Sequence, residues 1–237
     1  MSITTVLFDL DGTLLPMDQE EFTKGYLNLL VQKFAPLGYE PKTLVKNVWS
    51  GMTAMVTNDG KATNEERFWN VFESAYGKRV LSDKPIFDKF YKNEFESAKE
   101  FCGFNPSAAR AVKALRKAGL KTVLATNPIF PPSAVEARIR WAGLEPSDFE
   151  FYTTYENSSF CKPSAGYYQE IIDRLGVTAK ECLMVGNDVG DDMPARDIGL
   201  NVFLLTDCLI NKNNADINEY PNGNFDRLTE YIDEINR

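Results

Sequence analysis

The pattern of apolar and polar residues divides the chain into three stretches. Residues 3–8 form a short apolar run that ends at Asp9, which predicts a buried β-strand followed by a turn. Residues 16–103 place apolar side chains three and four positions apart, which is typical of amphipathic helices. From residue 105 onward, apolar runs of strand length alternate with helical patterns. That alternation is typical of a parallel, doubly wound sheet with helices on both faces.

The stretch of residues 16–103, called the helical insert below, is predicted to hold about four helices. Capping or turn residues mark the predicted helix ends: Asp18 with Glu21, Pro41, Thr63 with Glu66, Gly77 and Pro85. About half of the chain's aromatic residues lie in this insert. For any single ring, a place in a small aromatic core is favoured. The alternative is that one or two rings line a substrate cavity.

The remainder of the chain is predicted to form the α/β sheet. Its expected strands span residues 121–125, 149–153, 182–185 and 201–205. Its expected helices span residues 106–118, 132–142, 163–175, a short segment through 196, and 225–235. A polar loop is expected between residues 209 and 224. Residues 1–15 and 104–237 therefore form the predicted core, and residues 16–103 interrupt it.

Composition narrows the possible partners and location. The chain has 237 residues and a net charge of −8, which argues against nucleic acid or anionic membranes as its main partner. No apolar run is long enough to span a bilayer, and no secretory signal precedes the first strand. The four cysteines form no C-x-x-C pair, which indicates reduced thiols in a cytoplasmic protein.

The chain contains no histidine, and this excludes several kinds of hydrolytic site. Phosphohistidine chemistry and Ser-His-Asp triads need histidine, and so do most zinc hydrolases. No cysteine has an arginine six residues downstream, and no G-x-x-x-x-G-K-[ST] loop is present. The hydrolytic chemistry that remains rests mainly on carboxylates.

Asp9 and Asp11 are the leading candidates for that chemistry. Two positions apart in extended backbone, their side chains point to the same face, at the carboxyl end of the first strand. Gly12 permits a tight turn and close approach of a ligand. Asp9 could act as a nucleophile that forms an aspartyl-phosphate, Asp11 as an acid and base, and a hard cation such as Mg2+ could bind between them. The alternative is a surface turn rich in Asp and Gly.

Polar residues at other predicted strand ends complement the aspartate pair. Thr126 and Asn127 offer a hydroxyl and an amide to phosphate oxygens, although a plain turn is the alternative. Lys162 precedes a predicted helix, where it would add positive charge for a phosphate or for Asp9. Its alternative is a solvated surface lysine.

The segment of residues 186–192 is an acidic loop after an apolar strand. Its three aspartates, Asp188, Asp191 and Asp192, suit a hard cation, and the alternative is capping of the next helix.

Taken together, these residues resemble the haloacid dehalogenase superfamily, and its phosphatase branch in particular. Four motifs occur in the family's order: residues 9–13, Thr126, Lys162 and the acidic loop. The match covers residues 1–15 and about 104–206. The resemblance implies a Rossmann-like core, and it implies that the helical insert is a cap domain between the first and second motifs.

The resemblance also implies roles for the site residues. Asp9 would be the nucleophile and a Mg2+ ligand, and Asp11 the acid and base, with its backbone carbonyl on the metal. Thr126 and Lys162 would stabilise the transferring phosphoryl group. Asp188 would bind the metal and Asp192 would orient its waters. If Asn187 took the first acidic position instead, Asp191 or Asp192 would have to supply the charge.

The substrate-binding set is completed by Gly12, Thr13 and Asn127. Haloacid dehalogenases lack the second aspartate, so Asp11 favours phosphate chemistry. We therefore expect a Mg2+-dependent phosphatase acting on a small phosphorylated metabolite. A phosphomutase of the same superfamily is the nearest alternative, and a non-catalytic binding protein of this fold is the more distant one.

Overall fold

The computed structural model describes residues 2–236, and its sheet has five parallel strands in the order β2-β1-β3-β4-β5. The two end residues of the predicted core, Met1 and Arg237, lie outside the described residues. The strands are β1 (Thr5–Phe8), β2 (Lys121–Leu124), β3 (Cys182–Gly186), β4 (Asn201–Leu205) and β5 (Asn222–Gly223). The first strand of the chain is thus flanked on both sides, which explains why its residues are all buried.

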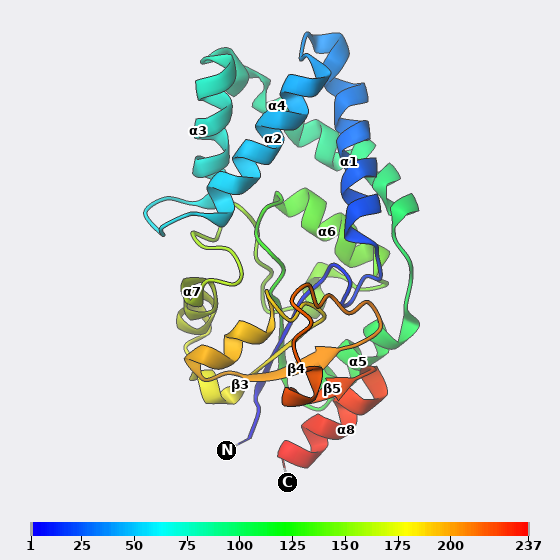
Figure 1. The fold of residues 1–237 in the computed structure, drawn as a ribbon. Coiled ribbons are helices and arrows are strands. Elements are labelled where there is room, and N and C mark those ends of the chain that lie inside the picture. The colour runs from blue at the N-terminus through cyan, green and yellow to red at the C-terminus, as the bar shows by residue number, and fades with distance from the viewer. Residues whose placement is uncertain (1, 237) are drawn as a thin grey trace.

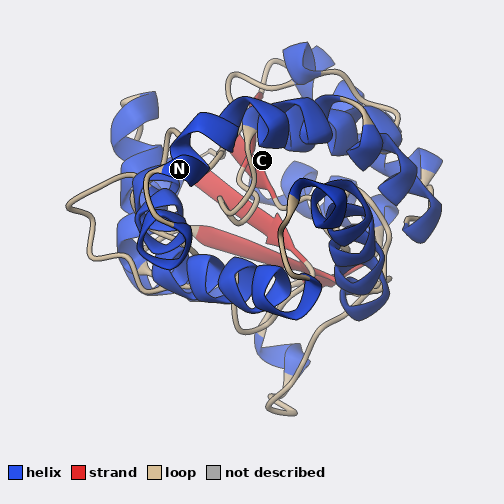
Figure 2. Cartoon of the chain, turned by 90° about the horizontal axis from the view of Figure 1, so that it is seen from above, coloured by secondary structure: helices blue, strands red, loops and turns tan. Residues whose placement is uncertain are grey.

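Helices cover both faces of this sheet, as the alternating pattern predicts (Figure 2). Val6 and Phe8 belong to one hydrophobic cluster, with α5 (Pro106–Lys117), α6 (Pro132–Trp141) and α8 (Phe225–Ile235). Leu7 belongs to the other, with α7 (Ala165–Leu175) and the 3-10 helix Met193–Ile198. Because successive strand residues point to opposite faces, one strand serves both layers. The fold is therefore the predicted doubly wound α/β type.

The helical insert stands over the carboxyl ends of the strands (Figure 1). Its helices are α1 (Gln19–Phe34), α2 (Pro41–Val56), α3 (Asn64–Tyr76) and α4 (Arg79–Lys92), with 3-10 helices Ala35–Leu37 and Glu94–Phe101. The predicted caps at Asp18, Thr63 and Gly77 are present. The remaining 3-10 helices are Pro146–Asp148, Ala179–Glu181 and Ile217–Glu219.

Three predicted elements differ from the structure. Residues 149–153 form a single bridge, between Leu124 and Tyr152, rather than a strand. The segment is held to β2 by only a few hydrogen bonds before the chain turns away. Within the predicted polar loop lies the short strand β5, whose backbone pairs with β4 although its side chains show no apolar alternation. The fourth helix begins at Arg79, so Pro85 lies inside it.

Among residues 2–236, none of the helices combines the length and the apolar character that crossing a bilayer would need.

Candidate active site

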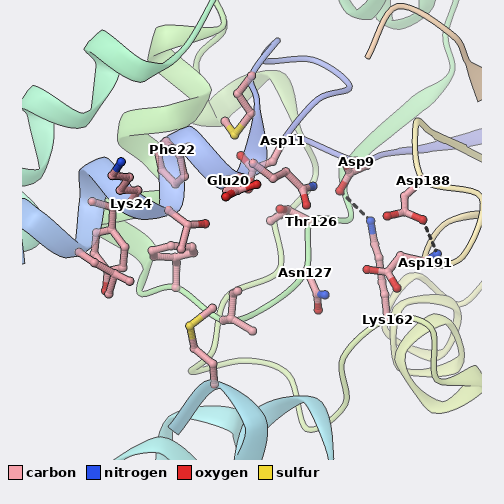
Figure 3. A pocket seen from close by; sticks show the side chains of 18 of the residues that line it. Asp9, Asp11, Glu20, Phe22, Lys24, Thr126, Asn127, Lys162, Asp188 and Asp191 are labelled. Atoms are coloured by element: carbon pink, nitrogen blue, oxygen red, sulfur yellow. Dashed lines mark hydrogen bonds and ion pairs between the residues drawn. The ribbon is translucent and has the colours of Figure 1, made fainter. Parts of the chain in front are cut away.

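Lys162 joins two of the predicted site aspartates. Its ammonium nitrogen lies 2.7 Å from Asp9 Oδ1 and 2.7 Å from Asp192 Oδ1, and the residue is only 2% exposed. Burial alone would lower the pKa of Lys162, but the charges of Asp192 and Asp9 outweigh it and raise that pKa well above its usual value. The lysine is therefore charged, and Figure 3 shows it extending toward Asp9.

The acidic loop separates the roles of its aspartates. Asp192 has both oxygens engaged, because Oδ1 accepts from Lys162 and Oδ2 accepts from the Asp188 backbone N–H at 3.0 Å. Burial raises the pKa of Asp192 to about 7. Asp188 Oδ1 accepts from the backbone N–H groups of Gly190 and Asp191 at 2.7 and 3.2 Å. The second Asp188 oxygen is outside these bonds, which makes Asp188 the better placed direct ligand.

Gly186 makes this loop geometry possible. A Cβ atom on Gly186 would lie 2.0 Å from Asp192 Oδ2, closer than such atoms approach each other. Any larger residue would therefore move the carboxylate that connects Lys162 to Asp188.

Asn187 has both polar atoms of its side chain hydrogen-bonded within the protein. Its Oδ1 accepts from the Thr13 hydroxyl at 2.9 Å, and its Nδ2 donates to the Cys208 carbonyl at 2.6 Å. Gly12 has a φ of +84°, and a Cβ there would lie 2.4 Å from Asn187 Nδ2. The structure thus places Gly12 and Thr13 against Asn187, and neither lines the cavity described below.

Asp11 is paired with Arg138, a residue that the sequence motifs did not identify. The Arg138 Nη1 donates to Asp11 Oδ2, its Nε donates to the Ala134 carbonyl, and its guanidinium lies 4.3 Å from the centre of the Phe130 ring. Arg138 is fully buried, whereas the Asp11 side chain is 23% exposed. Burial raises the pKa of Asp11, and the positive charge of Arg138 opposes that rise.

A charge on the buried stripe of α6 is the signal that could have found this residue. Arg138 lies four positions after Ala134 and one before Ile139, both fully buried. An arginine among such positions needs a buried anionic partner.

A single cavity of about 870 Å³ collects most of the predicted site residues. At its polar end lie Asp9, Asp11, Thr126, Asn127, Lys162, Asp188, Asp191 and Asp192. Asn127 Oδ1 and Asp11 Oδ1 are buried there and have no hydrogen-bond partner within residues 2–236. Such atoms are available to a ligand that brings donors or a cation. Among the aromatic residues of the helical insert, Phe22, Tyr26 and Trp49 line the same cavity.

The helical insert contacts the core at several places, and one of these is the hydrogen bond from Trp141 Nε1 to Glu96 Oε1 at 2.9 Å. The two connecting segments lie side by side, since the Gly103 N–H donates to the Pro16 carbonyl at 2.6 Å. Elsewhere, the buried Asn64 at the start of α3 has its Nδ2 within 3.1–3.4 Å of the Pro128 and Phe160 carbonyls and of Cys161 Sγ. Pro128 follows Asn127 and Cys161 precedes Lys162, so this contact supports both loops.

Within residues 2–236, no three Asp, Glu or Cys side chains form a ready-made metal site. The expected set uses only two direct carboxylates, from Asp9 and Asp188, with a backbone carbonyl as a further oxygen ligand. Lys162 contacts only Oδ1 of Asp9. The donors are all oxygen atoms, as Mg2+ prefers, so the residues present fit this ion.

The chain is similar to known hydrolases over most of its length. The sequence model of the haloacid dehalogenase-like hydrolases matches residues 3–199. A relative in Danio rerio, haloacid dehalogenase-like hydrolase domain-containing protein 3, is 25% identical in an alignment of 213 positions that covers 84% of this chain and 84% of that one.

Two solved structures share the fold. A HAD phosphatase from Thermococcus onnurineus superimposes with a TM-score of 0.60 at 20% identity, over the whole of both chains. A 2-haloacid dehalogenase from Pseudomonas syringae superimposes with a TM-score of 0.65 at 20% identity, over 98% of this chain and 99% of that one. The chain therefore belongs to the haloacid dehalogenase-like hydrolase family and is a hydrolytic enzyme.

Proposed function

We propose that this chain is a Mg2+-dependent phosphatase that hydrolyses a small phosphorylated metabolite through an aspartyl-phosphate on Asp9. The observation that supports this most directly is the pairing of two differently held carboxylates at one end of the cavity. Asp9 Oδ1 lies 2.7 Å from the charged Lys162 ammonium, which holds the carboxylate in a fixed orientation for a nucleophilic role. Asp11 is partly buried, and burial raises its pKa against the opposing charge of Arg138, which suits a group that donates a proton.

In the proposed reaction, an oxygen of Asp9 attacks phosphorus while the bond to the leaving oxygen breaks. Asp11 gives its proton to that oxygen, so the product leaves as an alcohol. Asp11 then takes a proton from the water that attacks the phosphorus of the aspartyl-phosphate. This second step releases inorganic phosphate and restores the Asp9 carboxylate.

Thr126, Asn127 and Lys162 would hold the phosphoryl oxygens. Their hydroxyl, amide and ammonium donors lie at the same end of the cavity as Asp9. Mg2+, when bound by Asp9, Asp188 and the Asp11 backbone carbonyl, would offset the charge of the phosphoryl group. Asp192 would act indirectly, by fixing Lys162 and the Asp188 backbone.

Asp11 favours a phosphatase over a dehalogenase. A halide leaves as a stable anion and needs no proton, whereas an alkoxide leaves poorly unless it is protonated. Among the solved structures with this fold are both a phosphatase and a dehalogenase, so the fold alone does not choose between them.

We further propose that the protein works in the cytoplasm and that its helical insert acts as a cap that limits access of water. Four free cysteines support a reducing compartment. The insert lies over the carboxyl ends of the strands (Figure 1), and its helices α1 and α2 contribute residues to the cavity lining, which supports the cap role. The boundaries at residues 15/16 and 103/104 stay a prediction.

The test is phosphate release from p-nitrophenyl phosphate and a panel of metabolite monophosphates, with Mg2+ or with a chelator. Wild type should release phosphate only with the metal, and Asp9→Asn should fall to background. Asp233→Asn, an exposed aspartate on α8, is the matched control and should keep full activity. Phosphate release by Asp9→Asn would refute the mechanism. Conversion of one phosphate isomer to another without net release would identify a phosphomutase.

A further inference from the structure

Helix α2 presents two different apolar faces. Leu44, Val48 and Met55 are buried within the helical insert. Val45, Trp49 and Met52, at positions i, i+4 and i+7, lie on a neighbouring face and line the cavity. Trp49 is 47% exposed. The apolar stripe of α2 is therefore wider than the core of the insert requires, and the excess faces the space above Asp9.

The neighbouring helix α1 lines the cavity with apolar side chains, which are Phe22, Tyr26 and Leu27, and with a separate polar stripe. Glu20, Lys24 and Asn28 follow one another at intervals of four on α1, with Thr23 beside them. On the core side, Ile129 and Phe130 add apolar surface. The cavity thus has a polar end for the phosphoryl group, an apolar wall on α2 that Phe22 and Tyr26 of α1 extend, and one polar stripe on α1.

This lining does not suit a small polyol phosphate. A cavity of about 870 Å³ lies near the top of the range of about 300–1,000 Å³ found for drug-sized ligands. The hydroxyl groups of a polyol would leave water to face the apolar wall without hydrogen-bond partners. A flat ring fits better, since one face can pack on an aromatic side chain while the ring edge meets polar groups.

We propose that the leaving group is a planar aromatic or heteroaromatic alcohol whose ring packs against Trp49 and Met52, with its polar edge toward α1. This inference rests on the proposed phosphatase function for the orientation of the substrate. The phosphoryl end would lie at Asp9, and the ring would occupy the outer part of the cavity under the helical insert.

The first test measures binding, so that it does not depend on catalysis. The probe is 2-(naphthalen-2-yl)ethylphosphonate, a non-hydrolysable aromatic ligand, titrated calorimetrically in the presence of Mg2+, with inorganic phosphate as the comparison. Trp49→Ala should weaken phosphonate binding by at least about tenfold and change phosphate binding by less than about twofold. The matched control is Val56→Ala, because Val56 lies on α2, is also 47% exposed and does not line the cavity. It should change neither affinity.

Two results of this titration would overturn the inference. One is phosphonate binding no tighter than that of phosphate in wild type. The other is an equal loss of affinity for the phosphonate and for phosphate in Trp49→Ala. That result would mean that Trp49 supports the packing of the insert on the core and does not contact the ring.

The second test compares kcat/KM for 2-(naphthalen-2-yl)ethyl phosphate and glycerol 3-phosphate. In both esters the phosphate is bonded to an alkyl carbon, but only the first alcohol carries an aromatic ring. The aromatic ester should be preferred by wild type, and Trp49→Ala should abolish most of that preference. Faster hydrolysis of glycerol 3-phosphate, unaffected by Trp49→Ala, would refute the inference and leave the phosphatase standing. Trp49-dependent phosphonate binding, with no phosphate release from either ester, from p-nitrophenyl phosphate or from the metabolite panel, would refute the phosphatase and support the ring site.

Discussion

Replacing Asp11 by asparagine should destabilise the folded protein, because Arg138 would keep its charge in a fully buried position without a carboxylate beside it. Removing one partner of a buried ion pair typically costs about 3–5 kcal/mol. We expect the lower end, about 3 kcal/mol, since the asparagine oxygen can still accept one hydrogen bond from the guanidinium.

The reverse substitution, Arg138→Met, should cost less. Methionine preserves much of the apolar contact with Phe130, and Asp11 can become neutral by binding a proton, which arginine cannot do by losing one. The Asp11 side chain is also 23% exposed, so its charge is partly hydrated. We expect Arg138→Met to lower the free energy of unfolding by about 1–2 kcal/mol. The double variant should be about 2 kcal/mol more stable than the sum of the two single losses predicts.

The assay is urea unfolding of all four proteins in the presence of a chelator. Burial raises the pKa of Asp11 in the wild type, and loss of the Arg138 charge should raise it further. The Arg138→Met protein should therefore gain more stability than the wild type as the pH falls through that raised pKa. The Arg138→Met penalty should therefore shrink on acidification, whereas the Asp11→Asn penalty should not. Additive single losses, or a larger penalty for Arg138→Met at every pH, would refute the reasoning.

Three further predictions concern other parts of the site. Gly186→Ala should displace the Asp192 carboxylate and lower the rate of phosphate release by about 10–100-fold. Gly190→Ala, in the same loop, should lower that rate much less. Similar losses of rate in the two variants would contradict this prediction. Thr13→Val should lower the free energy of unfolding by about 1–3 kcal/mol, because a buried Asn187 oxygen loses its hydrogen-bond donor. The KM for substrate should stay unchanged, and a changed KM would indicate that Thr13 binds substrate. Burial raises the pKa of the Cys102, Cys161 and Cys182 thiols to about 11 or 12. At pH 8 the folded protein should therefore react rapidly with a disulfide reagent at one cysteine at most, and all four cysteines should react after unfolding.

The elements that the sequence predicts well are those with strong side-chain patterns. The strand before Asp9, the strand at 201–205 and the helix at 225–235 combine clear apolar spacing with turn or capping residues at their ends. The strand β5 was missed because two residues paired through their backbone carry no such pattern. Pro85 suggests a helix start at that residue, but α4 begins at Arg79. Val80 and Phe87 lie on the same buried face of α4, and their burial favours the earlier start. It does so although Pro85 cannot donate a backbone hydrogen bond within the helix.

The site was predictable where a residue type at a strand end is enough, and unpredictable where the partner is distant in sequence. Asp9, Lys162 and Asp192 meet because parallel strands bring their ends together. The pairing of Asp11 with Arg138, 127 positions later, depends on how α6 packs. The sequence also leaves open whether Asp188, Asp191 or Asp192 binds the metal directly, because Asn187 could take the first acidic position. The hydrogen bond from Thr13 to Asn187 joins residues too far apart in the chain to be predicted from spacing.

The Asn64 contact has a mechanical consequence for the helical insert. A domain that contacts another only through its connecting segments can rotate about those segments as a rigid body. Here a second attachment, well away from those segments, fastens α3 to the two loops that follow Asn127 and precede Lys162. A further contact joins the 3-10 helix Glu94–Phe101 to α6, where Trp141 Nε1 donates to Glu96 Oε1. Several separated contacts oppose a free rotation of the insert unless they are released. We therefore expect substrate to enter by local movement of the side chains around the cavity while the insert as a whole keeps its place on the core.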